Sequence, residues 1–299
     1  MSKNKLFKHI IAPKLLCYFV ILLKYLPMSL RSKIGSLFGS VCGKFLTSST
    51  KQIISNLSVI KPFCRPESSK YYKNIIHMSW KHIGRVIFES LSFSKDNKEK
   101  IKSMILLENF NPEDLEQPAV YISAHFGNWE LLSRIPSAYD IDITFLYKKT
   151  KNKILRKLID DIRDINNTES NISWVESSIS PVKSIRKLMK DLSKGRAVGM
   201  LIDQVNSFDD QTIDFFSKKI KCTYLPAFLA LKFNISLFIV HNFYDGKIYR
   251  IKLNKIEPQN YFGVDTKIAA KEITKIIYKN FEEWIKEHPE QWLSIYRYW

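Results

Sequence analysis

The sequence predicts an α/β protein with a mainly parallel central sheet flanked by helices, preceded by an N-terminal helical region. Two observations support this fold class. Residues 1–93 carry apolar residues at helical spacing, and from Ile105 onward short apolar, β-branched runs alternate with helical stretches. Such alternation is typical of a parallel sheet with helices on its faces. We therefore expect a helical region over 1–93 and an α/β domain over 94–299.

The N-terminal region contains an apolar run over 15–23, between Lys14 and Lys24. A run of this length cannot cross a bilayer, which needs about 20 residues. We expect the segment to lie in a membrane interface, with basic side chains against anionic headgroups. A single tilted anchor helix is the alternative. A secretory signal is disfavoured because the apolar run is interrupted and no cleavage-like site follows it.

Helical patterns continue to residue 91. Gly35, Gly39 and Gly43 repeat at four-residue spacing, which lets a second helix approach closely, and we interpret the repeat as ordinary packing. Residues 47–50 can cap a helix over 51–60, and a longer helical pattern runs from 66 to 91. The charged residues 95–102 are expected to form a linker.

The α/β domain is expected to place its functional residues just after its strands. In sheets of this kind, ligands bind beyond the carboxyl ends of the strands. His125 and Asp203 both occupy such positions. Asp245 and Gly246 mark a hairpin between the last two strands. The expected strands cover 120–123, 143–147, 172–175, 197–202, 235–240 and 247–253, and the expected helices cover 128–138, 151–166, 180–193, 223–234 and 266–286.

Composition limits the class of protein. The 299 residues are 45% apolar and 13% aromatic, which is enough for a sizeable core. There are 47 basic and 29 acidic residues, a net charge of +18, so an anionic partner is expected: nucleic acid, an acidic protein or an anionic membrane. The four cysteines are far apart and show no metal-binding spacing, which indicates neither a disulfide framework nor a zinc site and favours a reducing, cytosol-facing environment.

The stretch Tyr121-Ile-Ser-Ala-His125-Phe-Gly-Asn-Trp-Glu130 is the candidate active site. A buried strand ends at His125, and Asn128 can cap a short helix that carries Glu130 in its first turn. This corner would let both side chains reach one space. An imidazole is a suitable general base, and a nearby carboxylate can hold its tautomer. A lone histidine at a strand end is more often structural, so the local pattern alone is weak.

Further short blocks follow in a characteristic order. Taken together, they resemble the bacterial lipid A late acyltransferases of the lauroyl/myristoyl type, within the lysophospholipid acyltransferase group. The resemblance covers roughly residues 15–299. The blocks are His125-Phe-Gly-Asn-Trp-Glu130, Asn152 with Arg163, Gly199-Met-Leu-Ile-Asp-Gln204, Phe215-Phe216, Thr223 with Pro226, Leu229 and Ala230, and Pro289-Glu-Gln-Trp292; the sequence departs from the family pattern at Lys148, Ser217, Ser294, Tyr296 and Tyr298.

The resemblance implies a glycerolipid acyltransferase-like fold and an enzyme that moves a fatty acyl chain from acyl carrier protein to a hydroxyl of an acylated lipid A precursor. It implies that His125 removes the hydroxyl proton while Glu130 orients the imidazole. Arg163 is expected to bind a substrate phosphate or the oxyanion, and Asp203 is expected to position either Arg163 or the substrate. Neither a metal nor a cofactor is expected. Substrate binding is also expected at Gly127 and Asn128, because the backbone N–H groups over 127–129 could receive the oxyanion. The basic run Lys148, Lys149, Lys151 and Lys153 could meet phosphates or an acidic carrier protein, but a solvated surface position is the stronger interpretation for any one of these lysines.

The resemblance also implies acyl carrier protein and an anionic membrane as partners, and a bacterial inner-membrane location with the catalytic domain facing the cytoplasm. Two alternatives are open. One is an acyltransferase that acts on a glycerophospholipid or another glycolipid acceptor with the same chemistry. The other is a non-catalytic basic protein that binds nucleic acid, which we do not expect because the sequence carries no recognised nucleic-acid-binding motif.

Overall fold

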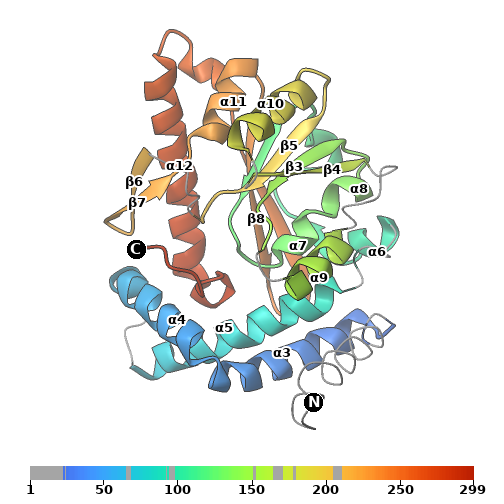
Figure 1. Cartoon of the computed structure of the whole chain (residues 1–299), viewed down its shortest axis with the longest axis vertical. Coiled ribbons are helices and arrows are strands. Elements are labelled where there is room, and N and C mark those ends of the chain that lie inside the picture. The colour runs from blue at the N-terminus through green and yellow to red at the C-terminus, as the bar shows by residue number, and fades with distance from the viewer. Residues whose placement is uncertain are drawn as a thin grey trace, which may run out of the picture.

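The computed structural model describes residues 23, 25–64, 69–91, 93, 98–150, 153–163, 171–177, 180–204 and 211–299. A seven-stranded sheet lies at its centre, in the order β1-β9-β8-β2-β5-β3-β4 (Figure 1). All neighbouring pairs are parallel except β8 and β9. The predicted fold class, α/β with a mainly parallel sheet, is therefore confirmed. The sheet strands are β1 (Ile105–Leu107), β2 (Val120–Ser123), β3 (Ile143–Tyr147), β4 (Ile172–Glu176), β5 (Ala197–Leu201), β8 (Leu237–Tyr244) and β9 (Tyr249–Ile256).

Strand β1 and the separate hairpin of β6 (Gln211–Phe215) and β7 (Lys218–Cys222) were not expected from the sequence. β1 is too short to show a period, and the hairpin strands are largely polar. The hairpin turns through Phe216 and Ser217, both with positive φ (49° and 59°). This left-handed backbone favours glycine, so a serine at position 217 is strained.

Helices cover both faces of the sheet. On one face, α10, α11 and α12 contact the strands; on the other, α6, α7 and α8 pack near β1 and β9. A charged linker was expected over 95–102, but residues 98–102 form the short helix α6, and residues 95–97 lie outside the described residues. The helices are α6 (Lys98–Lys102), α7 (Trp129–Leu132), α8 (Ile135–Ala138), α9 (Lys153–Arg163), α10 (Pro181–Leu192), α11 (Leu225–Phe233) and α12 (Thr266–Glu287), with the short 3₁₀ helices η2 (Lys61–Phe63), η4 (Pro112–Asp114), η5 (Pro258–Tyr261) and η6 (Pro289–Gln291).

Three further helices lie below the sheet in Figure 1: α3 (Met28–Phe45), α4 (Thr47–Ile60) and α5 (Ser69–Ser90). The glycines of α3 allow its close contact with α5, since a Cβ at Gly39 would lie 2.0 Å from the carbonyl oxygen of Trp80. The interpretation of the glycine repeat as ordinary packing is confirmed. Ile53, Leu57 and Trp80 belong to the same hydrophobic cluster as the central strands, α11 and α12. The division at residue 93 stays a prediction.

None of the helices in the described ranges is long and apolar enough to cross a membrane. The N-terminal apolar run, apart from Leu23, lies outside the described residues.

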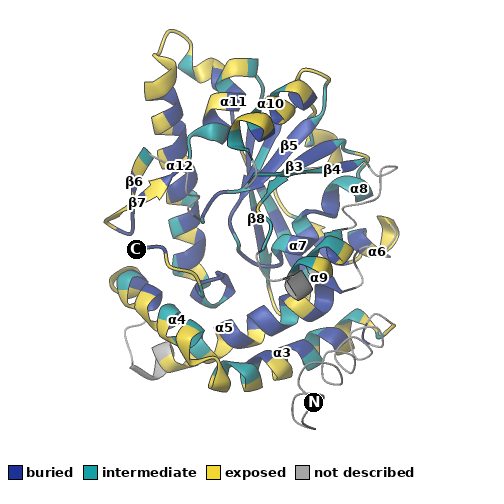
Figure 2. Cartoon of the chain, in the orientation of Figure 1, coloured by how far each residue is buried: buried dark blue, intermediate teal, exposed yellow. Residues whose placement is uncertain are grey.

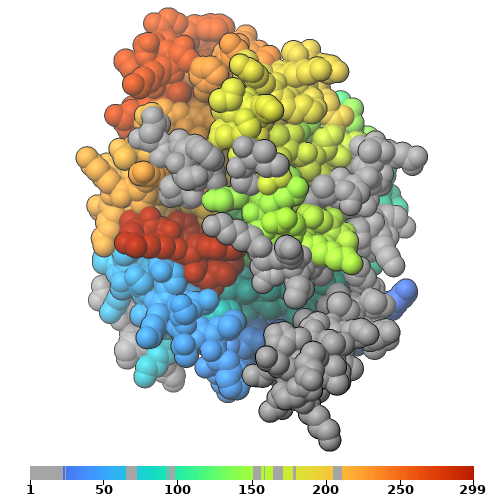
Figure 3. All heavy atoms as spheres, viewed as in Figure 1, coloured from blue at the N-terminus to red at the C-terminus, as the bar shows by residue number. Residues whose placement is uncertain are grey.

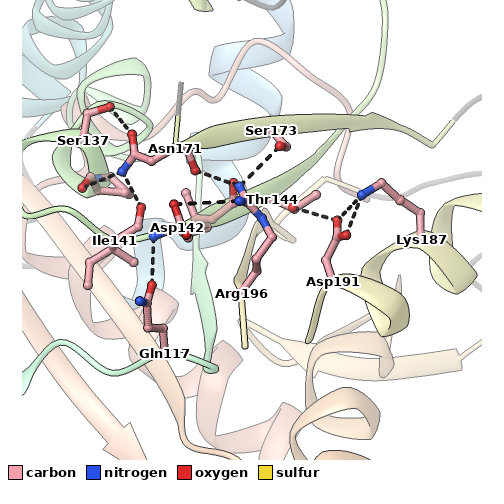
Figure 4. A network of polar contacts seen from close by, with 12 residues as sticks. Gln117, Ser137, Ile141, Asp142, Thr144, Asn171, Ser173, Lys187, Asp191 and Arg196 are labelled. Atoms are coloured by element: carbon pink, nitrogen blue, oxygen red, sulfur yellow. Dashed lines mark hydrogen bonds and ion pairs between the residues drawn. The ribbon is translucent and has the colours of Figure 1, made fainter. Parts of the chain in front are cut away.

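Polar contacts fix the amino ends of β3, β4 and β5, the edge of the sheet opposite the candidate site (Figure 4). Arg196 donates to the carbonyl oxygens of Ile143 and Asn171 at 3.1 and 2.8 Å. Thr144 donates to the buried carboxylate of Asp191 at 2.8 Å. The contacts of Arg196 link β3, β4 and β5 at their amino ends, whereas the Thr144 contact joins β3 to α10.

Candidate active site

His125 and Asp203 meet because their strands are neighbours. β2 pairs in parallel with β5, and the register places Ser123 beside Leu201. His125 and Asp203 each follow two residues after these paired positions, so they leave the sheet at the same edge. The sequence placed both at strand ends, and the strand order brings them together.

The imidazole of His125 is held by the carboxylate of Asp203. Oδ1 of Asp203 lies 2.8 Å from Nδ1 of His125 and also accepts the backbone N–H of His125 at 2.9 Å. Asp203 is fully buried. Burial disfavours its charged form, but the charge of His125 and the hydrogen bonds from His125 outweigh this effect and hold the pKa of Asp203 below its ordinary value. An ionised carboxylate only accepts, so Nδ1 carries the proton and Nε2 is the basic nitrogen.

Two C-terminal side chains complete the surroundings of Asp203. Its Oδ2 accepts from Nε1 of Trp292 at 3.3 Å and from the hydroxyl of Tyr298 at 3.1 Å. The backbone N–H of Leu293 donates to the carbonyl oxygen of His125 at 2.9 Å. Neither Trp292 nor Tyr298 was expected to have a role in the site. Trp292 stood in the C-terminal block and Tyr298 among the departures, which was the available signal.

Glu130 has a different partner from the expected one. Its carboxylate receives two hydrogen bonds from Arg163, Nε to Oε2 at 2.9 Å and Nη2 to Oε1 at 2.8 Å. The expectation that Glu130 orients the imidazole is therefore corrected: Asp203 occupies Nδ1, because β5 lies beside β2 while Glu130 faces α9. Burial opposes the charge of Arg163, but Glu130 outweighs burial and raises the pKa of Arg163 above its ordinary value.

Aromatic rings also hold Arg163. Its guanidinium carbon lies 5.0 Å from the centroid of Trp174 and 5.8 Å from that of Tyr147. Cations are attracted to the faces of such rings. The pair of Glu130 and Arg163 therefore joins α7 to α9 in one fixed arrangement.

Gly127 and Asn128 make hydrogen bonds within the fold. The N–H of Gly127 donates to the carbonyl oxygen of Gln291 at 3.1 Å, so it is not free to receive an oxyanion. Gly127 has φ +57°, and a Cβ there would lie 1.9 Å from the carbonyl oxygen of Asn242. Asn128 is fully buried and caps α7 by accepting from the N–H of Leu131 at 3.1 Å. The expected cap is confirmed, but neither residue lines the cavity described next, because both are enclosed by packed chain.

A cavity of about 700 Å³ opens beside His125, and both Glu130 and Arg163 line it. Its size is that of a ligand site. One wall is the sheet face that carries Tyr121 and Phe145. Most other lining side chains are apolar and come from α5, α7, α8, the strand ends and the segment after Trp292; they include Ile83, Val86, Leu132, Ile135, Ile141 and Leu293.

Two lysines of the expected basic run reach the cavity. Lys148 and Lys149 line it, and Nζ of Lys149 lies 2.9 Å from the carboxylate of Glu176. Lys151 and Asn152 lie outside the described residues, as does the side chain of Lys153. Within the described ranges, no group of three His, Cys, Asp or Glu side chains is arranged to hold a metal ion.

A search of curated protein sequences gave no significant match. Among solved structures, the chain is similar to the 1-acyl-sn-glycerophosphate (LPA) acyltransferase PlsC from Thermotoga maritima, with 12% identity, a TM-score of 0.38, and coverage of 84% of this chain and 97% of that chain. The chain also matches the family described as bacterial lipid A biosynthesis acyltransferase over residues 2–299. The protein is therefore an acyltransferase and belongs to the bacterial lipid A biosynthesis acyltransferase family.

Proposed function

We propose that this enzyme transfers a fatty acyl chain from acyl carrier protein to a hydroxyl group of an acylated lipid A precursor, with His125 as the general base. One observation carries the proposal. The imidazole of His125 is fixed through Nδ1 to buried Asp203 and lies at an apolar cavity large enough for an acyl chain. Family membership supports the acceptor class.

The chemistry follows from the tautomer of His125. Nε2 takes the proton of the acceptor hydroxyl as its oxygen attacks the thioester carbonyl carbon. The tetrahedral intermediate then collapses, the carbon–sulfur bond breaks, and the imidazolium returns its proton to the leaving thiolate. Asp203 stabilises the imidazolium by accepting from Nδ1 throughout. No covalent enzyme intermediate is needed.

The Glu130–Arg163 pair supports anion binding at the same cavity. Glu130 occupies two N–H groups of Arg163, and a guanidinium has five. The remaining N–H groups suit a phosphate of the acceptor or the oxyanion of the intermediate. Lys148, which is exposed at the cavity lining, adds positive charge for the acidic carrier protein. In this proposal Glu130 positions Arg163, and Asp203 positions His125.

An anionic membrane is the proposed partner of α3. This helix packs one side on α5 and exposes large apolar side chains on the other, among them Leu37, Phe38, Val41 and Phe45. Lys33 and Lys44 are exposed on the same helix, and the sequence contains no acidic residue before Glu67. Apolar surface with cationic neighbours suits the interface of an anionic bilayer. We place the enzyme on the cytoplasmic side of the inner membrane, where acyl carrier protein is available.

The experiment measures transfer from acyl–acyl carrier protein to a tetraacylated lipid A precursor and, in parallel, to a lysoglycerophospholipid. Wild type is compared with His125→Ala and Glu130→Ala after folding is confirmed. We expect transfer to the lipid A precursor and a loss of about 10²- to 10⁴-fold in His125→Ala. Unimpaired transfer in His125→Ala would exclude the mechanism, and transfer to the lysoglycerophospholipid alone would replace the acceptor.

A further inference from the structure

A buried carboxylate lies beneath the loop that joins His125 to Glu130. Glu89, near the end of α5, is almost fully buried. Its Oε2 accepts from Nδ2 of Asn128 at 3.0 Å and from the hydroxyl of Tyr249 at 2.5 Å. A carboxylate in such surroundings is costly unless it is hydrogen-bonded, and here each donor comes from a different part of the fold.

Asn128 links this carboxylate to the candidate active site. Its side-chain oxygen caps α7 through the N–H of Leu131, and its carbonyl oxygen accepts from Asn242 at 2.7 Å. α7 contains only four residues, Trp129–Leu132. A helix this short does not hold itself in place, so the cap residue fixes where Glu130 points.

α5 makes a second contact with the same loop. Nε2 of His82 lies 3.0 Å from the carbonyl oxygen of Gly127. Burial, together with the charge of Arg85, lowers the pKa of His82 to about 4, so at neutral pH the ring is neutral and donates to this carbonyl. Two residues of one helix, His82 and Glu89, therefore hold the chain between His125 and Glu130.

We propose that Glu89 is a positioning residue for acyl transfer, which acts through Asn128 to set the arrangement of His125 relative to the Glu130–Arg163 pair. Catalytic groups must be held to within a fraction of an ångström, and a displacement of about 1 Å can cost 10²-fold in rate. Without Glu89, the amide of Asn128 loses its only carboxylate acceptor among the described residues and is free to turn away from the cap. The inference rests on the proposed site of His125.

The alternative is that Glu89 only stabilises the fold. A matched control separates the two roles. Thr144 and Asp191 form another buried side-chain hydrogen bond, at 2.8 Å, at the opposite edge of the sheet (Figure 4). Thr144→Val removes a buried hydrogen bond without touching the loop. It is expected to lower the thermal stability and to leave kcat unchanged.

The experiment measures kcat, KM for both substrates and thermal unfolding in Glu89→Ala, Asn128→Ala, the double variant and Glu89→Gln. Each Ala variant is expected to lose about 10²-fold in kcat, because the loop that sets His125 against Glu130 is no longer held. The double variant should be no slower than either single variant, since both remove one linkage. Glu89→Gln keeps an acceptor oxygen for Asn128 and should recover most of the rate, which also guards against a failure of Glu89→Ala to fold.

Three results would overturn the inference: a kcat in Glu89→Ala that matches Thr144→Val, effects of Glu89 and Asn128 that multiply, or a Glu89→Gln variant as slow as Glu89→Ala. Failure of the proposed mechanism has a different signature. There, His125→Ala itself would keep its rate, whatever Glu89 does.

Discussion

Replacing Asp203 by Asn should abolish most of the acyl transfer, whereas replacing Glu130 by Gln should act mainly on stability and substrate binding. Asp203 accepts two hydrogen bonds from His125, and Asn differs from Asp only in charge and in one donor group. A hydrogen bond to a charged group contributes about 1.5–3 kcal/mol, which corresponds to about 10- to 10²-fold in rate. An Asn amide that donated to Nδ1 would also move the proton to Nε2 and remove the base, so the loss can approach 10⁴-fold, the upper limit for a general base.

Glu130→Gln leaves His125 and Asp203 in contact but removes the charge opposite Arg163. Both side chains of that pair are mostly buried. Removing one partner of a buried ion pair costs about 3–5 kcal/mol, and a Gln that still accepts one hydrogen bond should fall near the lower value. The variant is expected to unfold at lower temperature, to show a raised KM, and to lose less kcat than Asp203→Asn.

The assay is acyl transfer from acyl–acyl carrier protein, with kcat and KM determined separately and at a temperature where both variants are folded. Tyr298→Phe is the control, because it removes one hydrogen bond to Asp203 and leaves both contacts with His125. Our assignment is refuted if Glu130→Gln is as inactive as His125→Ala while Asp203→Asn stays within about threefold of wild type. That pattern would return the orienting role to Glu130.

Four further predictions concern other parts of the molecule. The pKa of His82 is about 6.5 in the unfolded chain but about 4 in the folded protein, so protonation of His82 should lower the free energy of unfolding by about 3 kcal/mol as the pH drops from 7 to below 4. Denaturant titrations at several pH values should show a smaller fall in His82→Gln, and the same pH profile in this variant as in wild type would contradict the assignment. Phe145→Ala should enlarge the cavity and shift the donor preference toward longer acyl chains, by about fourfold for each methylene that becomes buried. Competition between acyl donors of different length measures this shift, and an unchanged preference would exclude the sheet face as the binding site of the acyl chain. Ser217→Gly should raise the free energy of unfolding by about 1 kcal/mol because it relieves a left-handed residue, and equal or lower stability would argue against the observed turn. A photoreactive benzoylphenylalanine in place of Phe45, which is 78% exposed, should crosslink to lipid in phosphatidylglycerol vesicles. The same group in place of Phe262, which is 72% exposed, should not crosslink. Equal crosslinking at both positions would reject α3 as the surface that contacts the membrane.

The sequence predicted the sheet well because its strands are short apolar runs with clear ends. The bounds of β2 and β3 are the same as those expected. β5, which precedes Asp203, ends at Leu201, one residue before the expected end. The expected strand at 235–240 begins later and continues to Tyr244, because β8 pairs with β9 along its whole length. Long-range pairing of this kind leaves no local signal.

The partner of His125 could not be read from sequence spacing. A separation of five residues indicates that His125 and Glu130 share a corner, but the carboxylate that reaches Nδ1 depends on which strand lies beside β2. That strand is β5, which brings Asp203 from 78 residues away. The burial of Asn128 was missed for the same reason: its acceptor, Glu89, is 39 residues earlier and on a helix assigned to the other region.

The last described residues bear on when the enzyme can become active. Figure 3 shows the C-terminal residues, in red, directly above the blue N-terminal helices, and Asn56 of α4 donates to the carbonyl oxygen of Ser294 at 2.7 Å. Figure 2 shows the same segment largely buried. A ribosome that has finished α12 has already made His125, Glu130, Arg163 and Asp203, but Trp292 and Tyr298 are not yet in place to hold the Asp203 carboxylate. We therefore expect a chain that stops before Trp292 to contain every reactive group but to lack these two donors to Asp203.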